Sequence, residues 1–170
     1  MMYITDYQSP VGVLTLASDG ENLTGIYYEG QLDKEKPNIK KVNQSDQKLF
    51  KTVSLWLDEY FQGKNPAINF PYKAEGTEFR EQVWNELTKI PYGETVTYGD
   101  IAKKIAAIRG KEKMSAQAVG GAVGSNPISI VIPCHRVVGQ DNHLTGYGGG
   151  IDIKKQLLQC EDHNLDDFKE

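Results

Sequence analysis

The most informative feature of this chain is residues 128–138, which read Ile-Ser-Ile-Val-Ile-Pro-Cys-His-Arg-Val-Val. The apolar run 128–132 predicts a buried strand, and Pro133 is expected to end it because proline cannot donate to a sheet ladder. Cys134 would then lie rigidly at a strand end, with His135 beside it, and could face a cleft. Such a position suits a nucleophilic thiol.

Cys134 has a second interpretation, because a cysteine next to an apolar run is often a small buried hydrophobe. Neighbouring residues of an extended chain point to opposite faces, so His135 reaches the Cys134 sulfur only through a turn or a water molecule. Glu161, in the last helical stretch, is a candidate carboxylate for His135. The sequence thus indicates a possible relay of thiol, water, imidazole and carboxylate.

Several segments resemble one enzyme family in the same order along the chain. Residues 132–138 resemble the active-site motif of the methylated-DNA–protein-cysteine methyltransferases, also called O6-alkylguanine-DNA alkyltransferases. Residues 90–99 and 118–127 are similar to the helix-turn-helix region of that family. Residues 144–150 resemble its pocket loop, and residues 154–158 its closing helix. The similarity runs continuously from about residue 77 to residue 161.

The resemblance implies an α/β fold with two domains. Residues 1–72 would form a small N-terminal α/β domain with an antiparallel hairpin, of the ribonuclease H-like kind. Residues 73–170 would form a mainly helical domain that carries a winged-helix-like helix-turn-helix and the alkyl acceptor. The Pro-flanked stretch 65–72 suits the linker between them.

The function implied by the resemblance is DNA repair by direct alkyl transfer. Cys134 would accept the alkyl group of O6-methylguanine, and of O4-methylthymine, from duplex DNA bound through the minor groove. Because the reactive atom lies inside the duplex, the nucleotide must flip out of the stack. The thioether product is stable, so each molecule works once, and no cofactor is expected because the base supplies the alkyl group.

The resemblance also assigns roles to individual residues. The catalytic residues would be Cys134, His135, Glu161, Tyr98 and Asn126. The substrate would contact Tyr98, Val137, Tyr147 and Gly148. The DNA would contact Tyr98, Ala116, Gln117, Ala118, Gly120 and Arg136. Tyr98 would crowd the target phosphate and help the leaving guanine gain a proton, and Asn126 would bridge its turn to the active-site segment.

Two positions depart from the family pattern. Gln117 stands where many members have an arginine that enters the base stack, and glutamine keeps hydrogen-bonding groups but loses the charge. Gly148 stands where a serine often contacts the guanine oxygen, so only backbone groups remain there. We expect weaker DNA affinity from the first change.

Length and composition fit a small protein of a reducing compartment. The chain has 170 residues, a net charge of −4 and two cysteines, Cys134 and Cys160. No apolar stretch is long enough to span a bilayer, and residues 1–6 lack the features of a signal peptide. We therefore expect a cytoplasmic monomer with no metal site, because two cysteines cannot build a Cys-based zinc cluster.

The charge is unevenly distributed along the chain, which bears on DNA binding. Between residues 95 and 155 eight basic residues stand against four acidic ones, although the whole chain is acidic. The basic residues are Lys103, Lys104, Arg109, Lys111, Lys113, Arg136, Lys154 and Lys155. Scattered solvated lysines would give the same pattern, so only its overlap with the helix-turn-helix segment favours a DNA-binding face.

The first half of the chain shows strand, turn and helix patterns. Residues 12–17 and 23–28 predict two strands joined by the turn-forming stretch 19–22. Residues 34–45 are polar and predict a loop. Residues 47–61 carry apolar side chains at helical spacing, which predicts a helix that packs on the sheet.

Three hydroxyl residues mark helix starts in the second half. Thr77 is expected to cap a helix that Pro91 ends, and Thr97 to cap the first helix of the helix-turn-helix. Ser115 would cap residues 116–124, a helix of small residues. Small residues alone favour tight internal packing; the family resemblance makes this the recognition helix instead.

Two other functions are compatible with parts of the sequence. An alkyltransferase-like lesion sensor would bind alkylguanine without accepting the alkyl group, but such proteins lack the cysteine that is present here as Cys134. A cysteine hydrolase would use Cys134 and His135, but adjacent residues are poorly placed for a direct ion pair. The sensor is the main alternative.

Overall fold

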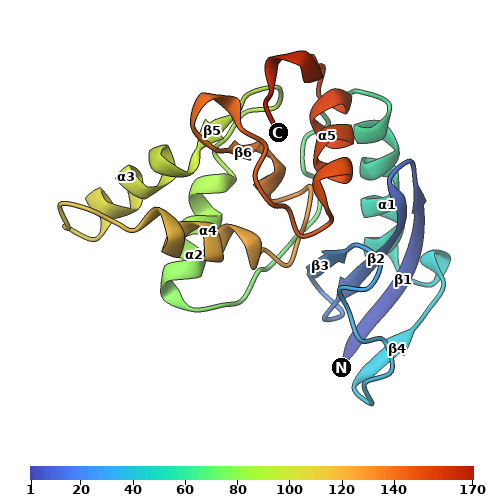
Figure 1. Cartoon of the computed structure of the whole chain (residues 1–170). Helices are drawn as coiled ribbons and strands as arrows, with labels where there is room; N and C mark the ends of the chain where they lie inside the picture. The colour runs from blue at the N-terminus through green and yellow to red at the C-terminus, as the bar shows by residue number, and fades with distance from the viewer. The chain divides into compact units, whose positions relative to one another are not determined.

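The computed structural model describes residues 1–170, and its chain divides into two units (Figure 1). The first comprises Met1–Glu75 together with Pro127–Ser129, and the second comprises Gly76–Asn126 and Ile130–Glu170. The first unit holds a sheet and a helix, whereas the second is mainly helical. This confirms the predicted α/β class, with a sheet domain followed by a helical domain.

The first unit is built on a four-stranded sheet. Its strands are β1 (Met2–Ser9), β2 (Gly12–Ser18), β3 (Leu23–Tyr27) and β4 (Ile39–Lys41), in the spatial order β3-β2-β1-β4. β2 pairs antiparallel with both β1 and β3, and β4 pairs parallel with β1. The predicted pair of strands is confirmed by β2 and β3.

The sequence prediction missed half of this sheet. β1 was not expected because polar residues such as Asp6 and Gln8 interrupt its apolar pattern, yet it is a central strand with Ile4 buried. The prediction of a loop over 34–45 is wrong in part, since β4 and a 3₁₀ turn (Gln44–Asp46) lie within it. A three-residue strand gives too short a pattern to recognise.

Helix α1 (Lys48–Phe61) supplies the rest of the core of the first unit, next to the sheet (Figure 1). Its buried residues include Phe50, Val53 and Leu57, which are fully shielded from solvent. Their spacing of three and four residues places them on one face of the helix. The predicted helix over 47–61 is therefore confirmed.

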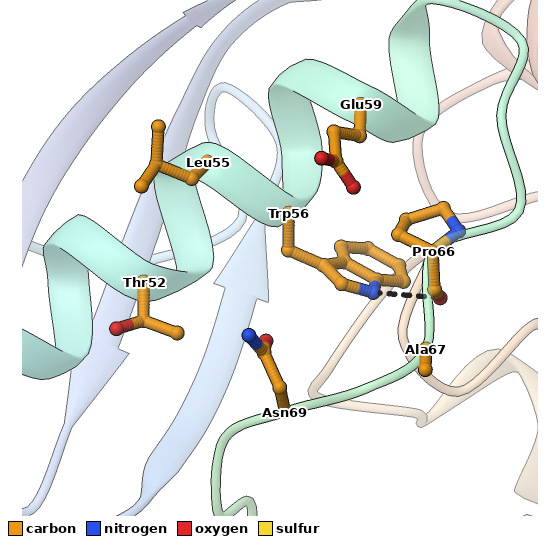
Figure 2. Close-up of a pocket in the computed structure, with 7 residues that line it drawn as sticks. All are labelled: Thr52, Leu55, Trp56, Glu59, Pro66, Ala67 and Asn69. Carbon is orange, nitrogen blue, oxygen red and sulfur yellow. Dashed lines mark hydrogen bonds between the residues drawn. The ribbon is translucent and has the colours of Figure 1, made fainter.

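A hollow of about 320 Å³ lies on the first unit between α1 and the extended segment that follows it. Figure 2 shows the side chain of Trp56 at its centre, where the indole Nε1–H donates a hydrogen bond to the Pro66 carbonyl, with an N···O distance of 3.1 Å. This bond and the edge-on packing of Trp56 and Phe70 hold the segment after α1 against the helix.

Four helices and a short two-stranded sheet form the second unit. The helices are α2 (Glu78–Leu87), α3 (Tyr98–Ile108), α4 (Ala116–Gly124) and α5 (Ile151–Cys160). β5 (Val96–Thr97) and β6 (Val137–Val138) pair in parallel. Helices α2, α3 and α4 pack together (Figure 1), and the Trp84 indole N–H donates to the Ala122 carbonyl at 2.8 Å.

The three predicted helix caps are present. The side-chain oxygens of Thr77, Thr97 and Ser115 accept hydrogen bonds from backbone N–H groups three residues later. Asp100 completes a capping box with Thr97, because its carboxylate accepts from the backbone N–H of Thr97. Such a cap stabilises a helix by about 1 kcal/mol, which makes the start of α3 well defined.

The prediction of a strand over 128–132 is wrong. Only Ile128 forms a bridge, with Ile26 of the first unit, and the following residues form turns. Ile130 has a φ of 73°, which is rare for a β-branched residue and incompatible with a strand. The run is apolar because it is buried on all sides, a situation that periodicity cannot distinguish from a buried strand.

Short 3₁₀ elements complete the second unit. They are η2 (Cys134–Arg136), η3 (Gln140–Asn142) and η4 (Leu165–Asp167). No helix of the protein combines the length and the apolar character that a membrane span requires.

Candidate active site

A tight turn at Pro133 places Cys134. The φ and ψ of Pro133 are −82° and 63°, and the Cys134 N–H donates to the Ile132 carbonyl at 2.8 Å. These values are those of an inverse γ-turn, whose φ the proline ring fixes in advance. Cys134 and His135 therefore belong to a 3₁₀ helix and are not extended, so their side chains do not point in opposite directions as the predicted strand required.

The Cys134 side chain is buried, with 7% exposure, and its sulfur is engaged by two neighbours. The Asn126 side-chain N–H donates to Sγ at 3.2 Å and to the Ile132 carbonyl at 2.8 Å. Burial raises the pKa of the thiol, while hydrogen bonds with Asn126 and Tyr147 act in the opposite direction. The thiol form therefore predominates at neutral pH, and a base is needed to generate the thiolate.

His135 and Glu161 form a buried pair. His135 Nε2 lies 2.5 Å from Glu161 Oε2, and neither side chain is exposed. Burial lowers the pKa of His135, so its imidazole is neutral at neutral pH even though Glu161 opposes this shift. A carboxylate can only accept a hydrogen bond, so the proton of the neutral ring lies on Nε2 and Nδ1 is the basic nitrogen.

Glu161 is surrounded by hydrogen-bond donors. Besides His135, the Arg136 Nε–H donates to Oε1 at 2.7 Å and the Gly93 backbone N–H to the same oxygen at 3.2 Å. Burial by itself would raise the pKa of Glu161, but His135 and Arg136 outweigh it and hold the pKa well below its usual range. Glu161 is therefore a carboxylate at neutral pH.

Gly93 reaches Glu161 because it occupies a left-handed position. Its φ is 79°, in a turn closed by a hydrogen bond from the Glu94 N–H to the Pro91 carbonyl at 3.1 Å. A glycine adopts this φ without steric cost. The turn thus aims one backbone donor at a carboxylate that is far away in the sequence.

The predicted DNA contact of Arg136 is not supported by its position. The side chain has only 11% exposure, and besides Glu161 it donates to the Ile90 carbonyl at 2.7 Å. Its guanidinium also lies over the Tyr92 ring, 5.8 Å from the centroid. Arg136 is committed inside the unit, because a buried carboxylate must be paired. Arg136 is therefore a partner of Glu161, and its contact with DNA stays a prediction.

Tyr98 is the first residue of α3, and its hydroxyl meets the segment that resembles a pocket loop. The Thr145 hydroxyl donates to the Tyr98 oxygen at 3.2 Å. Burial raises the pKa of Tyr98, so the phenol keeps its proton. A Cβ built on Gly120 of α4 would lie 4.0 Å from the Tyr98 ring, so these two predicted DNA contacts are neighbours.

The remaining predicted residues divide into buried and exposed groups. Val137 is fully buried in β6, whereas Tyr147 is half-buried and Gly148 is exposed. Ala116, Gln117 and Ala118 are exposed in the first turn of α4. The structure thus brings Asn126, Cys134 and Tyr147 together, and separately pairs His135 with Glu161.

Sequence reasoning missed three parts of this arrangement. It did not predict the Gly93 N–H, the Thr145 hydroxyl or the burial of Lys154, whose ammonium donates to the Val137 carbonyl at 2.7 Å. The Pro91-Tyr92-Gly93-Glu94 turn carried a signal for the first, since glycine at the third position favours this geometry. Nothing local distinguished Lys154 from a surface lysine.

The buried His135 predicts a dependence of stability on pH. Burial holds the pKa of His135 in the folded protein below its ordinary value of 6.5, so below pH 6.5 the unfolded chain binds a proton that the folded protein does not. As the pH is lowered below 6.5, the free energy of unfolding should therefore decrease. This group contributes at most about 1.4 kcal/mol per pH unit to the decrease. Urea unfolding between pH 7.5 and 5.5 measures it, with Trp84 fluorescence in a Trp56→Phe background reporting on the second unit.

The control for this prediction is His135→Gln in the same background. This variant should lose stability at pH 7.5 and show a flatter pH dependence below 6.5. An equal slope in both proteins would place the pH dependence elsewhere.

Both halves of the chain match known protein families. Residues 2–74 match the family described as 6-O-methylguanine DNA methyltransferase, ribonuclease-like domain. Residues 78–163 match the family described as 6-O-methylguanine DNA methyltransferase, DNA binding domain. The first of these extends the sequence resemblance to the part of the chain that showed no recognisable motif.

Curated relatives cover nearly the whole chain. The methylated-DNA–protein-cysteine methyltransferase of Haemophilus influenzae is 46% identical over 161 residues, which are 94% of this chain and 86% of the relative. That of Methanosarcina acetivorans is 43% identical over 160 residues, 94% of this chain and 98% of the relative.

Solved structures agree with the sequence relatives. The Mycobacterium tuberculosis O6-methylguanine methyltransferase superposes with a TM-score of 0.82 at 39% identity, over 95% of this chain and 93% of that one. A complex of the M. tuberculosis protein with DNA gives 0.81 at 38% identity, over 94% and 92%. With both halves matched to one family, the chain belongs to the methylated-DNA–protein-cysteine methyltransferases.

Proposed function

We propose that this protein repairs DNA by moving the alkyl group of O6-methylguanine onto Sγ of Cys134. The observation that carries the proposal is the arrangement around one thiol: Asn126 holds the sulfur, and the neutral His135 next in sequence is fixed by the buried Glu161 carboxylate. A thiol of raised pKa beside a neutral imidazole fits a nucleophile that is activated only when substrate is present.

The transfer proceeds as a single displacement. His135 takes the Cys134 proton at Nδ1 through a water molecule, and the thiolate attacks the alkyl carbon. The S–C bond forms as the C–O6 bond breaks, and guanine leaves with the electron pair. Tyr98 donates its phenolic proton to guanine N3, and the proton on His135 restores the phenol through solvent. Proton transfer of this kind accelerates reactions by about 10²–10⁴-fold.

Each molecule is expected to react once. The product is a thioether, and the residues around Cys134 offer no means of cleaving a C–S bond. O4-methylthymine presents the same alkyl–oxygen bond and would react in the same way. No cofactor is required, because bond formation and cleavage balance within the protein and the damaged base.

The DNA partner is proposed from the exposed face of α4. Its first turn presents small side chains, and a Cβ built on Gly121 or Gly124 would meet nothing within 4 Å. Such a face allows the backbone to approach the minor groove closely, with α3 and α4 as the helix-turn-helix. The complex of the M. tuberculosis relative with DNA supports a DNA partner. Flipping the target nucleotide, which costs a few kcal/mol, brings the base to Cys134.

Fewer basic side chains are exposed for DNA binding than the sequence count indicates. Arg136 and Lys154 are buried, so two of the eight basic residues counted between residues 95 and 155 present little or no charge at the surface. Lys104 lies 4.0 Å from the Glu86 carboxylate. We therefore expect modest DNA affinity with a shallow salt dependence.

The test is the intact mass of the protein after incubation with duplex DNA that contains O6-methylguanine. We expect one methyl group per molecule, located in the peptide that holds Cys134, with none transferred to Cys134→Ser. Methyl transfer to Cys160, or more than one equivalent per molecule, would contradict the proposal. Tight binding of the lesion without a gain in mass would instead identify a lesion sensor.

A further inference from the structure

Lys154 is a buried charge in the middle of α5. Its side chain has no exposure to solvent, which is very rare for a lysine without an acidic partner. The ammonium donates to the Val137 carbonyl at 2.7 Å and, more weakly, to the Thr145 carbonyl at 3.5 Å. The ion pairs of this unit involve Glu86, Glu161 and Glu170 but not Lys154.

The two carbonyls belong to two different walls of the candidate site. Val137 directly follows the 3₁₀ helix of Cys134, and Thr145 lies in the loop 144–150. Thr145 also donates its hydroxyl to Tyr98. Lys154 therefore joins α5 to β6 and to the loop, and through Thr145 it is linked to the residue at the start of α3.

A buried ammonium without a carboxylate partner is energetically unfavourable, so other groups must stabilise its charge. Burial lowers the pKa of Lys154 to about 8, and the negative charge of the Cys134 thiolate acts in the opposite direction. The same interaction favours the thiolate, and it also disfavours protonation of His135. Cys134 and His135 are thus the two titratable groups whose charge interacts with Lys154.

We propose that Lys154 is a positioning residue of the transfer reaction, which fastens the loop 144–150 to β6 and holds a positive charge at the Val137 carbonyl, three residues after the reactive cysteine. The first role rests on the proposed function, because it takes the loop to be a wall of the guanine pocket. The second role applies to any reaction of the Cys134 thiol. A positive charge there favours the thiolate that forms when His135 takes the Cys134 proton.

The first experiment compares Lys154→Met with Lys155→Met. The neighbouring Lys155 is ion-paired with Glu170, so its variant removes a charge from the same helix without touching the loop. Two probes are used: iodoacetamide, which reports the thiolate as a function of pH, and the free base O6-benzylguanine, which also needs the pocket. The alkylated residue is identified as Cys134 by peptide mapping in each case.

Lys154→Met should shift the pH midpoint of iodoacetamide alkylation upward and slow the reaction at neutral pH by roughly tenfold. The reaction with O6-benzylguanine should slow by at least roughly tenfold more, because the loop is no longer held in place. Lys155→Met should match the wild type with both probes. Lys154→Arg, which keeps the charge, should restore the iodoacetamide midpoint.

A midpoint that stays unchanged in Lys154→Met would overturn the electrostatic role, and equal losses with both probes would overturn the role in the loop.

A second measurement does not depend on the folding of these variants. The pKa of Lys154 is followed by NMR of ¹³Cε-labelled lysine in the wild type and in Cys134→Ser, with Lys154→Arg used to assign the signal. We expect a lower Lys154 pKa in Cys134→Ser, and equal values would refute the coupling.

These outcomes are separable from a failure of the proposed function. If the wild-type protein does not accept a methyl group from O6-methylguanine DNA, the iodoacetamide profile and the Lys154 titration still decide whether the lysine and the thiol are coupled.

Discussion

Glu161→Gln is expected to slow methyl transfer by about 100-fold or more at neutral pH, while binding to duplex DNA changes little. The amide no longer fixes the Nε2–H form of His135, so the ring is free to present the wrong nitrogen to the thiol. The side-chain partners of Glu161 are Gly93, His135 and Arg136, none of which lies in α3 or α4, the helices proposed to bind DNA. Single-turnover rates on O6-methylguanine DNA and the affinity for the same duplex measure the two effects separately.

The pH dependence distinguishes loss of a base from loss of structure. If Glu161 acts through His135, the difference in transfer rate between the wild type and Glu161→Gln should shrink as the pH approaches the pKa of the Cys134 thiol. At that pH the thiol ionises without a base. Removing the charge also leaves Arg136 buried without its partner, which costs about 3–5 kcal/mol of stability, so the midpoint of urea unfolding must be measured as well. A variant that reacts at the wild-type rate across neutral pH would make Glu161 a mere partner of Arg136.

Gln117→Ala is expected to slow repair of duplex DNA by about tenfold while leaving the reaction with free O6-benzylguanine nearly unchanged. Gln117 is exposed in the first turn of α4, where it can fill the space left by the flipped nucleotide. Flipping a nucleotide out of the duplex costs a few kcal/mol. Losing the contacts by which Gln117 would offset this cost should slow only the reaction with duplex DNA, because the free base needs no flipping. Single-turnover rates on the two substrates, measured side by side, test this.

The matched gain-of-charge variant is Gln117→Arg. It should tighten duplex binding and steepen the plot of log affinity against log salt by about 0.9 or less, the contribution of one phosphate contact. Equal losses of Gln117→Ala on both substrates would place Gln117 in support of the pocket and end the stack-filling interpretation.

The elements that were predicted correctly depend on local chemistry. Thr77, Thr97 and Ser115 each cap a helix because a side-chain oxygen and a nearby N–H suffice for the bond. The strand predicted over 128–132 failed because its apolar residues are explained by burial on every side, and no local rule foretells a left-handed isoleucine at position 130.

In the candidate site, too, local features were predicted and tertiary contacts were not. The residue pattern selected Cys134, His135 and Glu161 and the family resemblance supported them, but whether the histidine and the carboxylate meet depends on where α5 ends relative to η2. Arg136 and Lys154 were counted as surface charges, since most lysines and arginines are solvated. Arg136 and Lys154 are buried because α5 packs on η2. The local sequence around each residue does not reveal this tertiary contact.

Pro127–Ser129 completes the first unit with residues that are distant from it in the sequence. This tripeptide belongs to the first unit, where the Ile26 N–H donates to the Pro127 carbonyl at 3.0 Å, yet it is flanked by Asn126 and Ile130 of the second unit. The chain therefore crosses between the units at residues 75/76, 126/127 and 129/130. No single peptide bond therefore separates the two units. A fragment that begins at Gly76 would carry the tripeptide away with it and leave Ile26 of β3 without its hydrogen-bonding partner.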